Sequence, residues 1–402
     1  MTFDKLKSTA GLDLKGKRVL VRADLNVPVK DAKVSDATRL ERLLPGLKEL
    51  AQRGARVLVI SHFGRPQHGR DPRLSLAPVA SKLGELLGQP VAFAADCVGE
   101  PAERTVAALP PGGIAVLENL RFHAGEEKND PAFAQRLAAL GDVFVNDAFS
   151  AAHSAHASTT ALAGLLPSYA GPLLLEEIKA LNSVLENPKR PTAAVIGGAK
   201  VSSKIPVLKN LAAKVDTLIV GGGMANTFLL AQGCKIGKSL AEPDLAQTAL
   251  EIIGAAKEHR CQVLLPDDVV VAERMAAGAT ARTVPVRETP ADQMILDVGP
   301  KTVARYSGVI EGAKTLLWNG PLGAFEVEPF AGGTIALARA VAKLTKAGRL
   351  VSVAGGGDTV AALNAAGVTE EFSYVSTAGG AFLEWLEGRE LPGIVALVHA
   401  RS

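Results

Sequence analysis

The chain has 402 residues, 48% of them hydrophobic, which is enough for two or three domains with sizeable cores and excludes one small module. Its 44 Lys and Arg against 41 Asp and Glu give a formal net charge of +3, too small to argue for nucleic-acid binding. Residues 1–80 hold 16 basic and 8 acidic residues, whereas the rest holds 28 and 33. The N-terminal part of the chain is therefore the part expected to attract anions.

The cysteines and the N-terminus indicate a cytoplasmic protein. Cys97, Cys234 and Cys261 are an odd number without the spacing of a disulfide framework or a zinc site, so we expect buried thiols in a reducing compartment. Charges occupy the N-terminal segment where a signal peptide has its apolar core. The longest uncharged run, 148–175, is interrupted by polar residues and prolines, so we expect no membrane helix.

The first half of the chain reads as alternating strands and helices. Leucines at helical spacing predict a helix within 36–53, with Ser35 as its N-cap. Short apolar, β-branched runs of the kind that form strands buried on both faces occur at 18–26, 56–64, 114–122 and 142–149. The first two runs and the helix between them predict a βαβ unit.

The second half repeats this pattern after a helix that we take as the connection between domains. Prolines bracket about four helical turns of apolar spacing within 167–191. Further apolar runs, separated by Ala- and Leu-rich stretches, occur at 193–198, 217–223, 262–268, 315–320, 350–358 and 373–377. The fold class predicted is α/β, with two domains that each hold a parallel sheet flanked by helices.

In open α/β sheets, ligands bind outside the carboxyl ends of the strands, so the residues that end each run are the candidates for chemistry. Arginine presents a planar fork of donors that matches phosphate or carboxylate. Each such residue alone could be an ordinary surface side chain, but together they favour a small, doubly anionic ligand. In the first half these residues are Asp24, Asn26, His62, Arg65 and Arg121, with Arg39 in the first turn of the following helix.

In the second half the strands end in glycine. Glycine lets backbone N–H groups approach a ligand, and at helix N-termini such groups bind phosphates, although glycine is also an ordinary connector. Asp358 is either a helix cap or a Mg²⁺ ligand. Neither GxxxxGK[ST] nor GxGxxG occurs, so no P-loop or dinucleotide fingerprint is present. The glycine-bearing turns lie at 197–200, 221–223, 319–321, 355–358 and 376–380.

At these residues the sequence closely resembles the phosphoglycerate kinase family. The motifs follow one another along nearly the whole chain as RADLNVP (22–28), SHFGRP (61–66), ENLRF (118–122), NDAF (146–149), GGAKVSSK (197–204), GGGMANTF (221–228), WNGPLGAFE (318–326), GGGDT (355–359) and STAGGA (376–381). The resemblance implies two Rossmann-like domains joined by an interdomain helix and hinge. It divides the chain into a 3-phosphoglycerate domain (1–170), a linker helix (171–190), a nucleotide domain (191–384) and a C-terminal segment (385–402) that returns to the first domain.

The resemblance also implies roles for individual residues. Arg39, Lys200, Gly357 and Gly380 would act in catalysis, and Asp358 would hold the metal. The substrate would be bound by Asp24, Asn26, Arg39, His62, Phe63, Gly64, Arg65, Arg121 and the residue at position Ser154. The nucleotide would be bound by Gly198, Lys200, Lys204, Gly222, Asn319, Glu326, Gly355, Gly356, Gly357, Asp358 and Thr359.

The implied reaction passes a phosphoryl group between ATP and the carboxylate of 3-phosphoglycerate, with Mg²⁺, giving ADP and 1,3-bisphosphoglycerate. A carboxylic acid with a pKa of about 4 is already ionised near pH 7, so no general base is required. The enzyme must instead cancel the repulsion between two anionic reactants and exclude water. We expect a monomer with small-molecule substrates only, and neither nucleic acid nor membrane as a partner.

One position departs from the family pattern. Where the family has His-Arg-Ala-His, with the arginine on the substrate phosphate, this chain reads His153-Ser154-Ala155-His156. Loss of a charge-assisted hydrogen bond costs about 1.5–3 kcal/mol, so we expect a raised KM for 3-phosphoglycerate rather than an inactive protein. The residues leave two alternative functions open. One is a nicotinamide-dependent dehydrogenase on a two-domain α/β fold. The other is a non-catalytic binding protein, which the serine at position Ser154 suggests.

Overall fold

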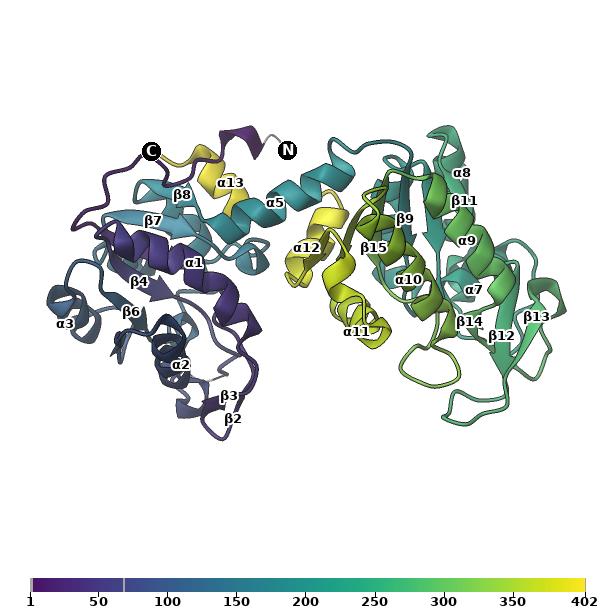
Figure 1. Ribbon diagram of the computed structural model, residues 1–402, viewed down its shortest axis with the longest axis horizontal. Coiled ribbons are helices and arrows are strands. Elements are labelled where there is room, and N and C mark those ends of the chain that lie inside the picture. Colours follow the sequence, from purple (N-terminus) through teal and green to yellow (C-terminus); the bar gives the residue numbers. More distant parts are fainter. Residues whose placement is uncertain (1–2, 68, 402) are drawn as a thin grey trace. The chain divides into compact units, whose positions relative to one another are not determined.

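The computed structural model describes residues 3–67 and 69–401, and these form two compact units (Figure 1). Unit 1 comprises the chain up to Ile178 together with the segment from Glu390, and unit 2 comprises Lys179–Arg389. The chain passes between the units twice, first within helix α5 (Pro172–Leu185) and again at 389/390. The first passage lies inside the segment that the sequence assigns to the linker.

Unit 1 is built on one six-stranded sheet, in which every neighbouring pair is parallel. All four residues of β6 and β7 and four of five in β1 and β4 are buried, as expected for strands covered on both faces. The sheet order is β5 (Val91–Ala94), β6 (Ile114–Leu117), β4 (Arg56–Ile60), β1 (Arg18–Arg22), β7 (Val143–Asn146) and β8 (Ser168–Ala170). A short hairpin, β2 (Val29–Lys30) with β3 (Lys33–Val34), follows β1.

The predicted first helix is present as α1 (Thr38–Gln52), and its leucines 40, 43, 47 and 50 are buried in the core of unit 1. The predicted cap is wrong: the N-cap position is Ala37, with no side-chain capping bond, while the Ser35 hydroxyl donates to the carbonyl of Pro28. The Asp36 carboxylate accepts from the Thr38 N–H instead (2.9 Å). The other helices of unit 1 before α5 are α2 (Ala77–Leu87), α3 (Glu100–Ala108) and α4 (Pro131–Ala138).

The uncharged run 148–175 is partly buried within unit 1, where the C-terminal segment packs against it. It forms short helical turns, including η5 (Ala157–Ala161), and strand β8. Helix α13 (Pro392–His399) packs on η5 and β8, and the Gly393 N–H donates to the carbonyl of Ala152 (2.9 Å). The burial of residues such as Ala157, Ser158, Leu162 and Ala163 gives a physical reason for the absence of charge at those positions.

Unit 2 holds a second six-stranded sheet whose neighbouring pairs are again all parallel. Its order is β11 (Gln262–Leu264), β10 (Thr217–Val220), β9 (Thr192–Ile196), β15 (Thr315–Asn319), β16 (Val351–Gly355) and β17 (Tyr374–Ser376). Its helices are α6 (Ile205–Ala212), α7 (Gly222–Ala231), α8 (Ala246–Glu258), α9 (Pro300–Gly312), α10 (Gly332–Lys346), α11 (Gly357–Ala366) and α12 (Gly380–Leu386). The sequence did not predict a small antiparallel sheet of β13 (Arg282–Pro285), β12 (Asp268–Ala272) and β14 (Met294–Val298).

Each main sheet has one point at which the strand order reverses, and such points create the crevices in which α/β proteins bind ligands. In unit 1 this point lies between β1 and β7, and in unit 2 between β9 and β15. The strands are shorter than the predicted runs, since β1 ends at Arg22 and β4 at Ile60. The candidate residues after them therefore lie in the loops beyond the sheet edge.

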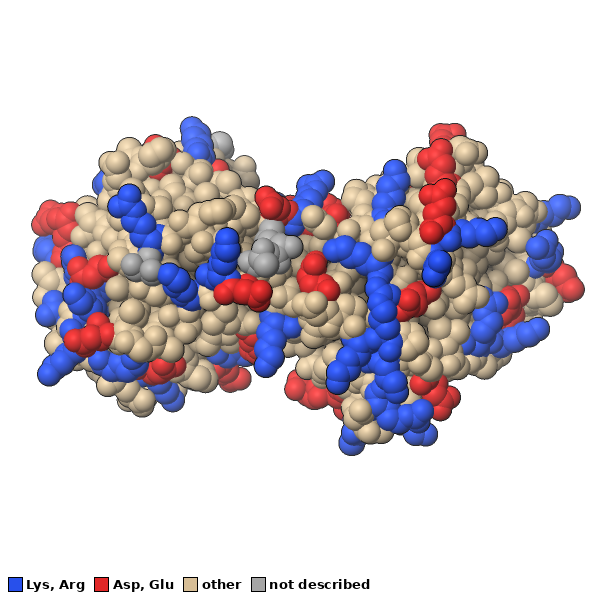
Figure 2. Space-filling view, turned by 90° about the horizontal axis from the view of Figure 1, so that it is seen from above, with Lys and Arg blue, Asp and Glu red and all other residues tan. Residues whose placement is uncertain are grey.

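None of the helices in the described ranges has the length and hydropathy needed to cross a bilayer. On the face drawn in Figure 2, basic and acidic side chains both occur over each unit, and several basic side chains adjoin one another in a band over unit 2.

Candidate functional site

In unit 1, the carboxylate of Asp24 organises the loop that follows β1. Its Oδ1 accepts from the Asn26 N–H (3.0 Å) and from Nη1 of Arg39 (3.2 Å), and its Oδ2 accepts from the Ser150 hydroxyl (2.5 Å). Burial alone raises the pKa of Asp24, but Arg39 and the Ser150 hydrogen bond outweigh it, so the net shift is downward. Arg39 also donates to the carbonyl of Asn26 (2.7 Å). The loop after β1 and the start of α1 are thus held as one cluster.

His62 is a neutral hydrogen-bond donor in this cluster rather than a cation. Nη2 of Arg22 lies 3.0 Å from its Nδ1, and because a guanidinium only donates, Nδ1 must accept and the ring proton lies on Nε2. Burial, and then the charge of Arg22, lower the pKa of His62 to about 3. At neutral pH His62 therefore offers an N–H to a ligand but adds no positive charge.

Arg22 itself is the residue that the sequence reasoning missed. Its side chain is only 1% exposed at the end of β1, and its Nε donates to the Ser158 hydroxyl (2.9 Å). That hydroxyl donates onward to Glu126 (2.7 Å), which also accepts from the Ser158 N–H (2.7 Å). Glu126 and Ser158 are both fully buried. A buried cation is thus linked through one hydroxyl to a buried carboxylate, an arrangement that fixes its position. A charged residue inside an otherwise apolar strand run was the available signal.

Arg121 is held next to the loop after β4. Its Nη1 donates to the carbonyl of Gly64 (2.7 Å), while its buried Nε lies 3.6 Å from Glu127 and makes no hydrogen bond to any described residue. Gly64 has a φ of +59°, and a Cβ there would lie 2.7 Å from Leu74. Its N–H donates to the side chain of Asn26 (3.0 Å), which joins this loop to the one after β1. Arg65, the next residue in the loop, is exposed.

The loop around Ser154 lies in the same unit and has no cation of its own. The Ser154 carbonyl accepts from the Thr159 hydroxyl (3.0 Å), and its side chain is half-buried. Burial lowers the pKa of His156, and the charges of Arg121 and Arg22 act in the same direction, so both guanidiniums exert their field on this loop. His153 Nδ1 is buried and has no hydrogen-bond partner in the described part of the chain. The positive charge near this loop therefore comes from strand and turn residues outside it.

Phe63, the remaining substrate candidate, is buried and acts through its backbone. Its N–H donates to Asn119 (3.1 Å), and the Asn119 amide donates back to its carbonyl (2.7 Å). Phe63 therefore places the residues on either side of it, His62 and Gly64, rather than offering a polar side chain.

In unit 2, the glycines after β9, β10 and β15 allow three loops to meet at the point where the strand order reverses. A Cβ on Gly197 would lie 1.9 Å from the carbonyl oxygen of Pro321, and one on Gly222 would lie 2.5 Å from that of Gly198. Gly198 and Gly222 also have φ values of +138° and +68°. Glycine is thus needed for backbone packing here, as well as for any approach of a ligand.

Asn319 connects the β9, β15 and β16 ends of this sheet. Its side chain accepts from Lys204 Nζ and donates to the carbonyl of Gly355 (2.8 Å). Gly356 has a φ of +99°, and a Cβ on it would lie 2.5 Å from the Asn319 amide nitrogen. The Thr359 hydroxyl accepts from the Gly320 N–H (2.7 Å). Burial lowers the pKa of Lys204, with the charge of Asp358 opposing it.

The other candidates of unit 2 face solvent. Lys200 follows the β9 turn, and Gly357 and Asp358 form the exposed first turn of α11. Gly380 begins α12 after Gly379, whose φ is +56°. Glu326 is exposed in the long connection between β15 and α10. The structure thus brings Lys204, Asn319, Gly355, Gly356 and Thr359 together through direct contacts, and it places Glu326 outside that contact set.

Comparison with known proteins matches this arrangement along nearly the whole chain. The phosphoglycerate kinase family model covers residues 9–389. The chain is 62% identical over 384 residues to the phosphoglycerate kinase of Methylorubrum extorquens, with 96% of each chain covered, and 60% identical to that of Azorhizobium caulinodans, with 96% and 97% covered. The solved structure of phosphoglycerate kinase from Coxiella burnetii superposes with a TM-score of 0.91 at 45% identity, and that from Pyrococcus horikoshii with 0.81 at 31%, each covering 98% of both chains. The chain belongs to the phosphoglycerate kinase family.

Proposed function

We propose that the two units of this phosphoglycerate kinase divide its reaction, with 3-phosphoglycerate on unit 1 and ATP or ADP with Mg²⁺ on unit 2. The observation that carries this proposal is the contrast between the two strand-end edges. Unit 1 presents guanidinium groups and an imidazole N–H, whereas unit 2 presents glycine turns around Lys204 and Asn319. The first set suits a small carboxylate and phosphate, and the second suits backbone binding of nucleotide phosphates.

On unit 1, the charges available to the substrate come from Arg39, Arg65 and Arg121, with His62 as a neutral donor. Arg39 is anchored by Asp24, so its second Nη and its Nε are the donors left to face a reacting group. Donors held in place before the reaction stabilise charge on transferring oxygens without further reorganisation. Because Ser154 supplies no guanidinium, we propose that this chain holds the substrate phosphate less tightly than a chain with arginine there.

On unit 2, Lys200 and Lys204 would meet the nucleotide phosphates and the migrating phosphoryl group, and the amides at the starts of α11 and α12 would hold the phosphates that remain on ADP. Asp358 is an exposed carboxylate in the first turn of α11, which is a hard oxygen ligand suited to Mg²⁺. When bound, the metal supplies positive charge to the phosphate oxygens. Transfer requires the two ligands to meet, and we place the hinge for that movement in the chain passage through α5. A monomeric state and a cytoplasmic location are part of this proposal, and sedimentation velocity and cell fractionation test them.

The role of Lys200 provides the test of this assignment. Lys200 is exposed, so Lys200→Ala should leave the fold intact, abolish ATP-dependent phosphorylation of 3-phosphoglycerate in a coupled assay, and retain ADP binding by calorimetry. Lys257→Ala, an exposed lysine in α8, is the matched control. Turnover by Lys200→Ala equal to that of the control would contradict the assignment.

A further inference from the structure

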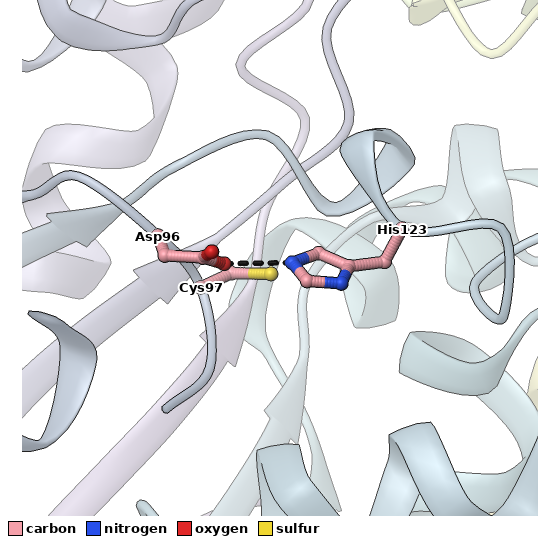
Figure 3. A group of neighbouring side chains, drawn as sticks. All are labelled: Asp96, Cys97 and His123. Carbon is pink, nitrogen blue, oxygen red and sulfur yellow. Dashed lines mark hydrogen bonds and ion pairs between the residues drawn. The ribbon is translucent and has the colours of Figure 1, made fainter. Parts of the chain in front are cut away.

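A cluster of three potential metal ligands lies in unit 1 among residues that the reaction does not use. Asp96 and Cys97 follow strand β5, and His123 follows the short η3 turn (Leu120–Phe122). One ligand atom from each of the three residues lies within 4.8 Å of the others. Figure 3 shows the Cys97 sulfur pointing toward the same His123 nitrogen that bonds Asp96. The sequence analysis predicts no zinc site, because Cys97 stands alone and His123 follows it by 26 residues.

The three side chains are held in position before any ion arrives. His123 Nε2 lies 2.7 Å from Asp96 Oδ1, and the imidazole stacks on Phe133 with ring centroids 5.1 Å apart. The Val98 N–H donates to the same Asp96 oxygen (3.4 Å). The side chains of Asp96 and His123 are 34% and 26% exposed, whereas Cys97 is fully buried. An ion can therefore enter from solvent past Asp96 and His123 and meet the sulfur at the inner end of the cluster.

We propose that Asp96, Cys97 and His123 form a site for a divalent transition-metal ion of the zinc class. Thiolate, imidazole and carboxylate are the three ligand types that zinc accepts, and three protein ligands leave a fourth position for water. Tetrahedral bonds of about 2.0–2.3 Å place ligand atoms roughly 3.3–3.6 Å apart, so small side-chain rotations from the present spacing suffice.

The charge balance favours such an ion. The carboxylates of Asp96 and Glu126 place negative charge near the Cys97 side chain. The same negative field attracts a divalent cation. Binding releases the thiol proton to solvent and shifts the imidazole proton from Nε2 to Nδ1, so that one Zn²⁺, one thiolate and one carboxylate sum to zero charge. Magnesium, which prefers oxygen ligands, should not compete.

The test uses the full chain, freed of metal with a chelator and titrated with Co²⁺ and Zn²⁺. We expect one equivalent of Co²⁺ to give tetrahedral visible bands and a near-ultraviolet thiolate-to-cobalt band, and Zn²⁺ to remove both. Zn²⁺ binding should release about one proton per chain from the thiol. Cys97→Ser should lose the thiolate band, and His123→Asn should weaken Zn²⁺ by more than the roughly 10- to 100-fold cost of losing an outer-shell partner.

Cys261→Ser removes another buried thiol, in unit 2, and should leave every signal unchanged. If Cys97→Ser does not fold, His123→Asn carries the test, because the His123 side chain is partly exposed. Absence of the thiolate band in the native chain would overturn the proposal. So would binding that survives both Cys97→Ser and His123→Asn, since the ion would then lie elsewhere.

Discussion

The buried link from Arg22 through Ser158 to Glu126 makes a quantitative prediction for Ser158→Ala. The substitution removes one hydroxyl but leaves two charged groups without a partner atom, the Arg22 Nε that donated to it (2.9 Å) and the Glu126 oxygen that accepted from it (2.7 Å). Hydrogen bonds to charged groups contribute about 1.5–3 kcal/mol each, and breaking a buried charged pair costs about 3–5 kcal/mol. We expect the free energy of unfolding of unit 1 to fall by about 3–5 kcal/mol.

Ser168→Ala is the matched control in the same unit. Ser168 is also buried, but among the described residues its hydroxyl donates to backbone carbonyls alone, those of Leu166 (2.8 Å) and Ala163 (3.1 Å). Its removal should cost about 1 kcal/mol, the usual contribution of a neutral hydrogen bond.

The assay for both variants is urea unfolding followed by far-ultraviolet circular dichroism. Tryptophan fluorescence would miss the effect, because both tryptophans, Trp318 and Trp385, belong to unit 2. If Ser158→Ala loses no more stability than Ser168→Ala, then the hydroxyl does not bridge two buried charges, and the account of how Arg22 and His62 are positioned is wrong.

Three further predictions concern single positions. Ser154→Arg should lower the KM for 3-phosphoglycerate by roughly 10- to 150-fold in steady-state assays. The control Ala155→Arg, which adds an arginine at the exposed neighbouring position, should not lower the KM. Equal KM values for the two variants would refute the proposed weak binding of the substrate phosphate. Burial raises the pKa of Asp147 to about 7, so the folded state holds a proton that the unfolded chain releases. Stability should therefore fall as pH rises from about 4 to 7, with a contribution from Asp147 of up to about 1.4 kcal/mol per pH unit. Asp147→Asn should remove that contribution in urea titrations, while Asp297, whose pKa burial also raises to about 7, keeps its own. Gly356→Ala should weaken ADP binding in calorimetry. It should also reduce stability by about 1–3 kcal/mol through backbone strain, in addition to the clash of the new Cβ with Asn319. The control Gly348→Ala, at a φ of +70° with open space around the new Cβ, should leave ADP binding intact.

The sequence by itself determined the alternation of strands and helices, the two parallel sheets and the strand-end positions of the candidate residues. These features are local, because apolar periodicity and the glycine or polar residue that ends a run are written in neighbouring positions. The predicted helix cap is nevertheless wrong at the start of α1, where the first helical N–H, that of Thr38, donates to Asp36 rather than to Ser35. The antiparallel sheet of β12, β13 and β14 was also missed, since its pairing depends on strands separated by loops.

Only the tertiary structure decided which distant residues share a contact and what charge each one carries. Arg22 meets Ser158 across 136 positions, and Lys204 meets Asn319 across 115, because the order of strands in each sheet brings those ends together. The sequence leaves the charge of His62 open, whereas burial beside Arg22 makes it a neutral donor. The free energy of an ionised side chain depends on its solvation and on charges that lie nearby in space, and neither is encoded in the residues next to it along the chain.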